Sequence, residues 1–313
     1  MKKVLGIPAV VTIATIAASG TLASCSAADQ EASSGGDAVQ SEPERSDVTG
    51  ASQEDPPTTY RQYVALGDSY AAMGSRDTQH SGPEECFRSG DNYPTLLAED
   101  EHIENFVDAT CASAVTQDVT SVRTGDEGFI PAQIDSITED IDLVTISIGG
   151  NDIGFPEIAG CFQEAAAAGT ESDCASRFPD NNELFGAAPE MLFHTYSSIQ
   201  NKAPGADVFV TGYLPLITEN GDCPDAGFIS DEDREWAVSL TNELNELISK
   251  IASELHFTFV LPEEAAEHTV CAEPSQRWTD VSGVETGAYP MHPTALGQEA
   301  MAQAISEAIS AKL

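Results

Sequence analysis

The chain has 313 residues and carries 52 Asp and Glu against 13 Lys and Arg, a formal net charge of −39. A field of this sign repels nucleic acid phosphates and anionic lipid headgroups, so neither is an expected partner through charge. The length suffices for one large hydrophobic core.

The first 25 residues have the organisation of an export signal. Lys2 and Lys3 precede an apolar run over 4–18, and small residues follow in "LASC" at 22–25. The run is too short for a permanent membrane span, so residues 1–25 are predicted to be a signal peptide. The ending resembles a bacterial lipobox, which implies cleavage before Cys25 and a lipid on that cysteine. The predicted location is the outer face of the cell membrane; the alternative is a plain secreted protein.

Residues 26–60 are rich in Ser, Gly, Ala, Glu, Asp and Pro and have almost no large apolar side chains. They are predicted to form a flexible acidic linker. The folded domain is predicted to span 61–313.

Short β-like runs and longer helical patterns alternate along this domain. Strands are predicted at 63–66, 106–109, 143–148, 207–211 and 257–261, and helices at 93–99, 184–202, 231–255 and 293–312. This alternation predicts an α/β fold with a central, mostly parallel sheet covered on both faces. Residues 161–185 are expected either to shape a substrate crevice or to form a disulfide-tied surface loop.

Three stretches directly follow predicted strands: Ser69 in "YVALGDSYAAMG", residues 111–114 in "TCASA", and Asn151 in "GGND". Ligands bind beyond the carboxyl ends of parallel strands. We therefore expect these three loops to converge on one crevice.

Six cysteines follow the signal peptide, an even number that indicates disulfides in an exported chain. They are Cys86, Cys111, Cys161, Cys174, Cys223 and Cys271. Sequence alone leaves several pairings open, and the simplest joins nearest neighbours. No Cys-x-x-Cys pair and no His/Asp/Glu cluster has the spacing of metal ligands, so neither a metal nor a cofactor is expected.

A serine hydroxyl becomes an effective nucleophile when a histidine base lies within hydrogen-bond reach. Among six histidines, His292 stands out because it precedes Pro293 and the predicted C-terminal helix. Proline is favoured at the first helical position, which would put His292 on the loop that begins the helix.

The order "GDSY", "GGND" and "HP" resembles the SGNH (GDSL-type) hydrolase family, and the likeness spans about residue 62 to the C-terminus. The six-cysteine layout and "YVALGDSYAAMG" look like the secreted actinobacterial lipases and esterases of that family. The resemblance implies a three-layer α/β/α sandwich. It also implies the disulfides Cys86–Cys111, Cys161–Cys174 and Cys223–Cys271.

Carried over residue by residue, the resemblance makes Ser69 the nucleophile and His292 the general base. The oxyanion hole would use the backbone N–H of Ser69, the backbone N–H of Ser113 and the side chain of Asn151. Ser113 stands where the family often has glycine, and Ala112 or Ala114 is the alternative donor. Asp68 is expected to be structural.

A second departure concerns the residue that orients the base. Many family members have an Asp three positions before the histidine, and this chain has Tyr289 there. The Tyr289 backbone carbonyl is predicted to hold His292, with the Asp280 carboxylate as the alternative.

The expected activity is hydrolysis of carboxylic esters through an acyl-enzyme on Ser69. A carbohydrate or glycolipid deacylase is the alternative within this class, and a non-catalytic surface-binding lipoprotein is the alternative from another class. The expected partner is a small-molecule or lipid ester, with membrane contact only through the anchor at Cys25 and a monomeric state.

Overall fold

The computed structural model describes residues 59–125, 128–221 and 223–313. The predicted signal peptide, Cys25 and residues 26–58 of the predicted linker lie outside the described residues. Tyr60, predicted to belong to the linker, is buried and pairs with Ile103, and its hydroxyl donates to Asp207 at 2.6 Å. The folded part therefore includes Tyr60.

A five-stranded parallel sheet forms the centre of the described fold. Its order is β4-β1-β7-β8-β9, with every neighbouring pair parallel. The strands are β1 (Tyr63–Gly67), β4 (Phe106–Asp108), β7 (Leu143–Ser147), β8 (Asp207–Thr211) and β9 (Thr258–Val260). All five lie where the sequence predicts strands, within a residue or two at each end.

The strand order places a topological switch point between β1 and β7. The chain runs from β1 to β4 on one side, then to β7 on the other side of β1, and continues outward through β8 and β9. Crevices at such points, outside the carboxyl ends of the strands, are where doubly wound sheets bind ligands. Ser69 follows β1 and Asn151 follows β7, so both residues lie at the switch point.

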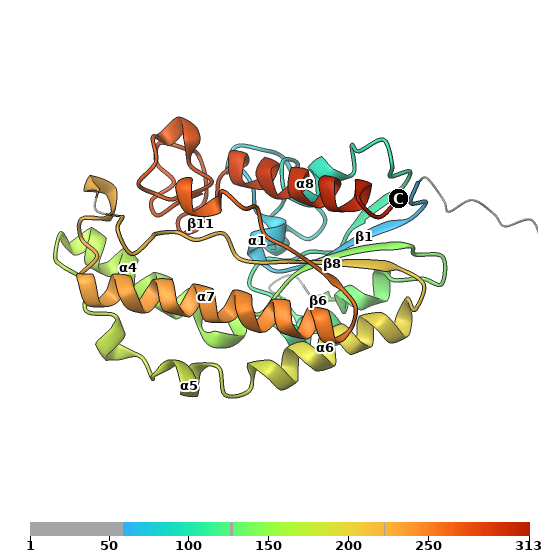
Figure 1. Cartoon of the computed structure of the whole chain (residues 1–313), viewed down its shortest axis with the longest axis horizontal. Helices are drawn as coiled ribbons and strands as arrows, with labels where there is room; N and C mark the ends of the chain where they lie inside the picture. The colour runs from blue at the N-terminus through green and yellow to red at the C-terminus, as the bar shows by residue number, and fades with distance from the viewer. Residues whose placement is uncertain (1–58, 126–127, 222) are drawn as a thin grey trace, which may run out of the picture. The chain divides into compact units, whose positions relative to one another are not determined.

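Alternate side chains of the inner strands enter two separate cores. Val64 and Leu66 pack in one cluster with α6 (Ala188–Lys202) and α7 (Asp231–Glu254). Tyr63 and Ala65 pack in the other with α2 (Tyr93–Leu97) and α8 (Ala295–Ser310). Figure 1 shows α8 on one side of the strands and α6 and α7 on the other. The predicted α/β fold, with a parallel sheet covered on both faces, is confirmed.

The remaining elements are short, apart from one helix. The other helices are α1 (Ser69–Ala72), α3 (Thr116–Thr120), α4 (Phe155–Ala168) and α5 (Asn181–Leu184). Three two-stranded pairs join β2 (His80–Ser81) to β3 (Arg88–Ser89), β5 (Arg123–Thr124) to β6 (Phe129–Ile130), and β10 (Thr279–Asp280) to β11 (His292–Pro293). No helix within the described ranges is long and apolar enough to cross a membrane.

The helices depart from the sequence predictions in three places. Residues 155–168 form α4, where no helix was predicted. The predicted helix over 184–202 is divided between α5 and α6. Pro293 does not begin the C-terminal helix; it pairs with Thr279 in β10–β11, and Thr294 caps α8 with its side chain.

Disulfides join Cys86 to Cys111, Cys161 to Cys174, and Cys223 to Cys271. These are the three nearest-neighbour pairs. The second bridge ties the middle of α4 to the segment that follows it. The first bridge fixes the loop after β4, which borders the switch point.

Candidate active site

Ser69 lies at the point where β1 becomes a helix. The strand ends at Gly67, and Asp68 caps α1 by accepting a hydrogen bond from the Tyr70 N–H at 2.9 Å. Ser69 is therefore the first residue of α1. Its backbone N–H is among those that a helix leaves without an intrahelical partner.

The side chain of Gln133 hydrogen-bonds to both the N–H and the carbonyl of Gly67, two residues before Ser69. The Gly67 N–H donates to Gln133 Oε1 at 2.7 Å, and Gln133 Nε2 donates to the Gly67 carbonyl at 2.8 Å. Gly67 has φ +139°, and a Cβ there would lie 2.5 Å from the Ser147 carbonyl oxygen. Glycine is required at this position because the strand end is twisted and closely packed.

His292 reaches the site on β11. Its short pairing with β10 matches Asp280 with His292 and Thr279 with Pro293. The Met291 N–H donates to the Asp280 carbonyl at 2.9 Å, and the Thr294 hydroxyl donates to the Arg277 carbonyl at 2.5 Å. These contacts fix the loop on both sides of the imidazole.

The imidazole of His292 connects Ser69 to a main-chain carbonyl. Nε2 lies 2.8 Å from Ser69 Oγ, and Nδ1 lies 2.7 Å from the Pro290 carbonyl oxygen. A carbonyl can only accept, so Nδ1 carries the proton and Nε2 is left as the acceptor for the serine hydroxyl. This tautomer is the one that a general base requires.

The prediction that the Tyr289 carbonyl orients the imidazole is wrong, because the carbonyl at Nδ1 is that of Pro290, one residue later. The Tyr289 carbonyl instead accepts from the backbone N–H of His292 at 3.2 Å. Asp280, the alternative, directs its buried carboxylate toward Ser282, Thr286 and Arg277.

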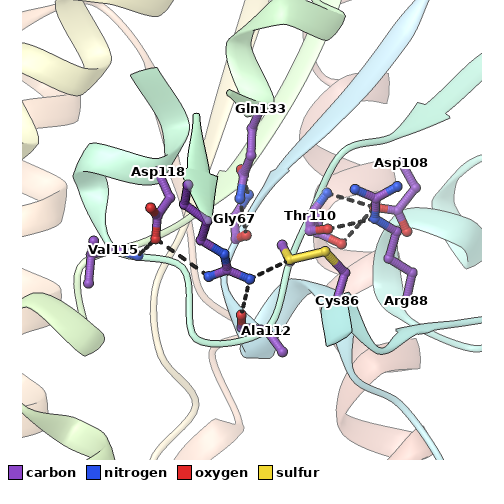
Figure 2. Close-up of a disulfide and its surroundings, with 11 residues drawn as sticks. Gly67, Cys86, Arg88, Asp108, Thr110, Ala112, Val115, Asp118 and Gln133 are labelled. Atoms are coloured by element: carbon purple, nitrogen blue, oxygen red, sulfur yellow. Dashed lines mark hydrogen bonds and ion pairs between the residues drawn. A yellow bond between two sulfur atoms is a disulfide. The ribbon is translucent and has the colours of Figure 1, made fainter. Parts of the chain in front are cut away.

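The loop after β4 presents Ser113 to the site. Figure 2 shows Ala112 close to the disulfide that anchors this loop and Asp118 farther from it. Arg123 donates to the Ala112 carbonyl at 3.1 Å and lies 3.5 Å from the Asp118 carboxylate. Ser113 adopts φ +60°, in the left-handed region, so the backbone does take up a conformation that favours glycine.

Backbone hydrogen bonds show which of the three candidate N–H donors on this loop remains available. The Ala112 N–H donates to the Cys86 carbonyl at 3.0 Å, and the Ala114 N–H donates to the Cys111 carbonyl at 3.1 Å. Within the described residues, the Ser113 N–H has no such acceptor. It is therefore the N–H of the three that remains for a ligand.

Asn151 joins the turn after β7 to the same loop. Its side-chain NH₂ donates to the Ala114 carbonyl at 2.7 Å. An amide NH₂ has two hydrogens, so one remains for another acceptor. Asn151, Ser113, Ser69 and His292 line one cavity, so the structure brings these four sequence-predicted residues together.

The cavity has a volume of about 200 Å³ and extends from the Ser69–His292 pair between α4 and α7. Its walls are mostly apolar and include Phe155, Ile158, Ala159, Phe162, Leu214, Leu216, Ala237 and Leu240. A smaller cavity of about 50 Å³ shares Phe162, Leu216, Ala237, Thr241 and Met291 with it. Within the described residues, no group of three or more His, Cys, Asp or Glu side chains is arranged to hold a metal ion.

Burial sets the electrostatics of the site. Desolvation lowers the pKa of His292, and the hydrogen bond to the Pro290 carbonyl opposes that change. Desolvation raises the pKa of Asp68 to about 7, although hydrogen bonds from Tyr213 and the Tyr70 N–H act in the opposite direction. The neutral imidazole is thus favoured, which is the form that accepts a proton.

Sequence reasoning missed two parts of this site. Residues 161–185 were expected either to shape a substrate crevice or to form a surface loop, and Phe162 does line the cavity, but the helix α4 that carries much of the apolar wall was not predicted. Tyr213, whose hydroxyl contacts Asp68, lies 145 residues away along the chain and carries no local signal.

Comparisons with known proteins cover most of the described chain. The sequence model of the GDSL-like Lipase/Acylhydrolase family matches residues 65–300. Lipase 2 of Streptomyces coelicolor is 32% identical over 254 residues, which cover 77% of this chain and 83% of that protein.

Two solved structures have similar folds. The extracellular lipase of Streptomyces rimosus superimposes with a TM-score of 0.65 and 28% identity, covering 79% of this chain and 98% of that one. Phospholipase A1 of Streptomyces albidoflavus gives a TM-score of 0.61 and 28% identity, covering 80% of this chain and 99% of that one.

Proposed function

Because this chain belongs to the GDSL-like Lipase/Acylhydrolase family and is a carboxylic ester hydrolase, we propose that it cleaves esters through an acyl-enzyme on Ser69. One observation carries this mechanism: the 2.8 Å contact of His292 Nε2 with Ser69 Oγ, with Nδ1 bonded to a carbonyl. That arrangement makes the imidazole a proton acceptor for this hydroxyl.

In the first half of the reaction, Ser69 Oγ attacks the ester carbonyl carbon while His292 Nε2 takes the hydroxyl proton. The carbonyl oxygen becomes an oxyanion, which the Ser69 and Ser113 N–H groups and the Asn151 side chain stabilise. The tetrahedral intermediate then expels the alcohol, which receives the proton from His292. The acyl group remains esterified to Ser69.

In the second half, His292 removes a proton from a water molecule, which attacks the acyl-enzyme carbonyl. Collapse of the second intermediate breaks the bond to Ser69 Oγ, and the proton returns to that oxygen. The carboxylic acid is released, and the base is again neutral.

The cavity supports an acyl chain longer than acetyl as the preferred substrate group. Aliphatic and aromatic side chains form its walls, and a smaller apolar cavity borders it beyond Phe162. An acetyl group would leave most of this lining uncovered, whereas a longer chain gains free energy for each methylene buried. The similar proteins are called lipases and a phospholipase A1, and we extend that substrate class to this chain. An acetyl-sugar deacylase is the less favoured alternative.

The disulfides and the N-terminal sequence support an exported, membrane-anchored location. Three disulfides are typical of a protein exported to an oxidising compartment. We propose that Cys25 carries the lipid anchor and that the segment after it tethers the hydrolase to the membrane surface. Metabolic labelling with a radioactive fatty acid should mark the wild type and leave the Cys25→Ser variant unlabelled; equal labelling of the two, or an unlabelled wild type, would contradict the anchor.

Replacement of Ser69 tests the activity. Ser69→Ala should abolish hydrolysis of p-nitrophenyl esters and labelling by a fluorophosphonate probe, while the circular dichroism spectrum stays unchanged. His292→Ala should reduce both by several orders of magnitude. Undiminished turnover by Ser69→Ala would overturn the mechanism. A wild-type protein that neither hydrolyses esters nor reacts with the probe would instead be a binding protein.

A further inference from the structure

Asp68 and Tyr213 form a buried polar pair that takes no part in the proton transfers described above. Each side chain is only 1% exposed. Tyr213 lies in the segment after β8, while Asp68 follows β1 directly. A buried polar group is stable only when it is hydrogen-bonded, so the partners of this pair reveal what it holds together.

The Tyr213 hydroxyl joins the ends of two neighbouring strands. It donates to Asp68 Oδ2, and its oxygen accepts from the Gly150 N–H at 2.8 Å. The other oxygen of Asp68 accepts from the Tyr70 N–H at 2.9 Å. Burial and the nearby Asp68 carboxyl keep the pKa of Tyr213 well above its usual value, so the hydroxyl stays protonated and remains a donor.

Both ends of the Tyr213 residue are fixed. Its backbone N–H donates to Asn245 Oδ1 at 2.7 Å, and Asn245 Nδ2 donates to its carbonyl at 2.9 Å. Its ring packs against Tyr70 and Phe155, with ring centroids 4.8 and 5.5 Å away. The hydroxyl is therefore held in place by α7 and by two aromatic neighbours.

Gly150 approaches this ring closely. A Cβ at Gly150 would lie 3.0 Å from two ring atoms of Tyr213 and 2.8 Å from Phe155. The turn that carries Asn151 is thus pressed against Tyr213 and hydrogen-bonded to it. A shift of the Tyr213 hydroxyl would therefore move Gly150, which is the residue next to Asn151.

We propose that Tyr213 is a positioning residue, whose hydroxyl sets the Gly150–Asn151 turn against the Asp68–Ser69 turn and so fixes the geometry of the oxyanion hole. The proposal rests on the proposed function. Oxyanion donors stabilise a transition state because they are already oriented when charge develops. Tyr213 does not touch the reacting atoms; it acts through Gly150 on one side and Asp68 on the other.

Tyr213→Phe removes the hydroxyl and keeps the ring. The matched control is Tyr196→Phe, because Tyr196 is equally buried and its hydroxyl has no hydrogen-bond partner among the residues that the structure describes. Two inhibitors separate positioning from general damage. An alkyl boronic acid forms a negatively charged tetrahedral adduct on Ser69 with a boron-bound oxygen in the oxyanion hole, whereas the alcohol of the same chain length only fills the apolar cavity.

Tyr213→Phe should bind the boronic acid about 10- to 100-fold more weakly and lower kcat by a similar factor. Its affinity for the alcohol and its KM should stay within about twofold of the wild type, because the Tyr213 hydroxyl does not contribute to binding of the ground state. Tyr196→Phe should match the wild type for both inhibitors. Unchanged boronate affinity in Tyr213→Phe, or an equal loss for both inhibitors, would overturn the proposal.

Asp68→Asn provides a second route if Tyr213→Phe does not fold. The asparagine can still accept from the Tyr70 N–H, but its NH₂ cannot accept from Tyr213. It should show the same selective loss of boronate affinity, and an unaltered affinity would refute the proposal. Fluorophosphonate labelling of the wild type distinguishes a failure of the positioning role from a failure of the proposed function. If Ser69 is labelled and the variants behave as the wild type, only the positioning role fails; if the wild type is not labelled, the proposed function fails.

Discussion

In the proposed mechanism, a main-chain carbonyl orients the base. The Pro290 carbonyl fixes the tautomer of His292 as a carboxylate would, but it offers no full charge to stabilise the imidazolium. Burial adds to this by lowering the pKa of the imidazole. The enzyme therefore keeps its base neutral at the cost of a less stable protonated form.

This arrangement predicts the acid limb of the pH profile. Activity requires neutral His292, and its pKa lies below the ordinary 6.5, so kcat/KM should rise with pH and reach half its maximum below that value. The measurement is kcat/KM for a p-nitrophenyl ester across the acid and neutral range. Because burial raises the pKa of the Asp68 carboxyl to about 7, the profile should be repeated with Asp68→Asn. A midpoint at or above 6.5 in that variant would contradict the prediction.

Ser113 replaces the glycine that the family often has, yet its backbone keeps a conformation that favours glycine. Its φ of +60° is one that glycine adopts without strain. Ser113→Gly should keep kcat/KM within about threefold of the wild type, because the donor is the backbone N–H. Ser113→Val, whose branched side chain disfavours this φ, should lower kcat/KM about tenfold or more. An equal loss in the two variants would show that the serine hydroxyl matters instead.

At the scale of elements, the sheet and the helices α4 and α7 contribute different parts of the site. The segments after β1, β4 and β7 and the strand β11 carry the polar groups, and the two helices contribute most of the apolar wall. The Cys161–Cys174 bridge fixes α4 beside this cavity. Substrate preference should therefore respond to α4 without any change in the catalytic residues.

Ala159→Phe tests whether α4 controls the substrate preference. Ala159 lines the cavity, and a phenyl ring there would occupy space meant for the acyl chain. We expect kcat/KM for a decanoyl ester to fall about tenfold or more, with the acetyl ester changed little. Ala166→Phe is the control, because Ala166 is exposed on the same helix. Parallel losses for both esters, or no change for either, would refute the assignment of this wall.

The strands could be predicted from sequence because each is a short run of apolar, often β-branched residues bounded by turns. Ser69, Ser113, Asn151 and His292 were carried over from the family resemblance, and the structure places them around one cavity. The rest depended on contacts that are distant in sequence. Pro293 pairs with Thr279 instead of beginning α8, and no local pattern signals that pairing.

Within the site itself, the orienting carbonyl was missed by one residue. The backbone from Tyr289 to His292 turns sharply, with Met291 at φ +63°, and this turn brings the Pro290 carbonyl to Nδ1. The contact of Tyr213 with Asp68 was likewise invisible, since it joins segments after two different strands. Such contacts follow from the assembled sheet and not from any short stretch of chain.

The whole molecule combines a large negative charge with three covalent cross-links. A net charge of −39 favours the expanded chain through self-repulsion, while the disulfides restrict the unfolded state. Each bridge stabilises a domain by roughly 2–4 kcal/mol. Repulsion between exposed charges is screened by salt, whereas the effect of the disulfides is not.

Thermal stability should therefore increase with ionic strength. The screening length falls from about 30 Å at 0.01 M salt to about 3 Å at 1 M, so the unfolding midpoint should rise by several degrees over this range. NaCl and KCl should act alike, because screening depends on ionic strength and not on the cation. Calorimetry in both chlorides provides the measurement. A flat or falling midpoint would show that self-repulsion does not limit the stability of this protein.

The transfer of an acyl group to Ser69 is tested most directly by trapping it. A p-nitrophenyl N-alkyl carbamate should release one equivalent of nitrophenolate and leave a slowly hydrolysed carbamoyl group on the enzyme. Peptide mass mapping should place that group on Ser69, with none on the Ser69→Ala variant. A carbamoyl group on another residue, or the same nitrophenolate release by the Ser69→Ala variant, would contradict the account.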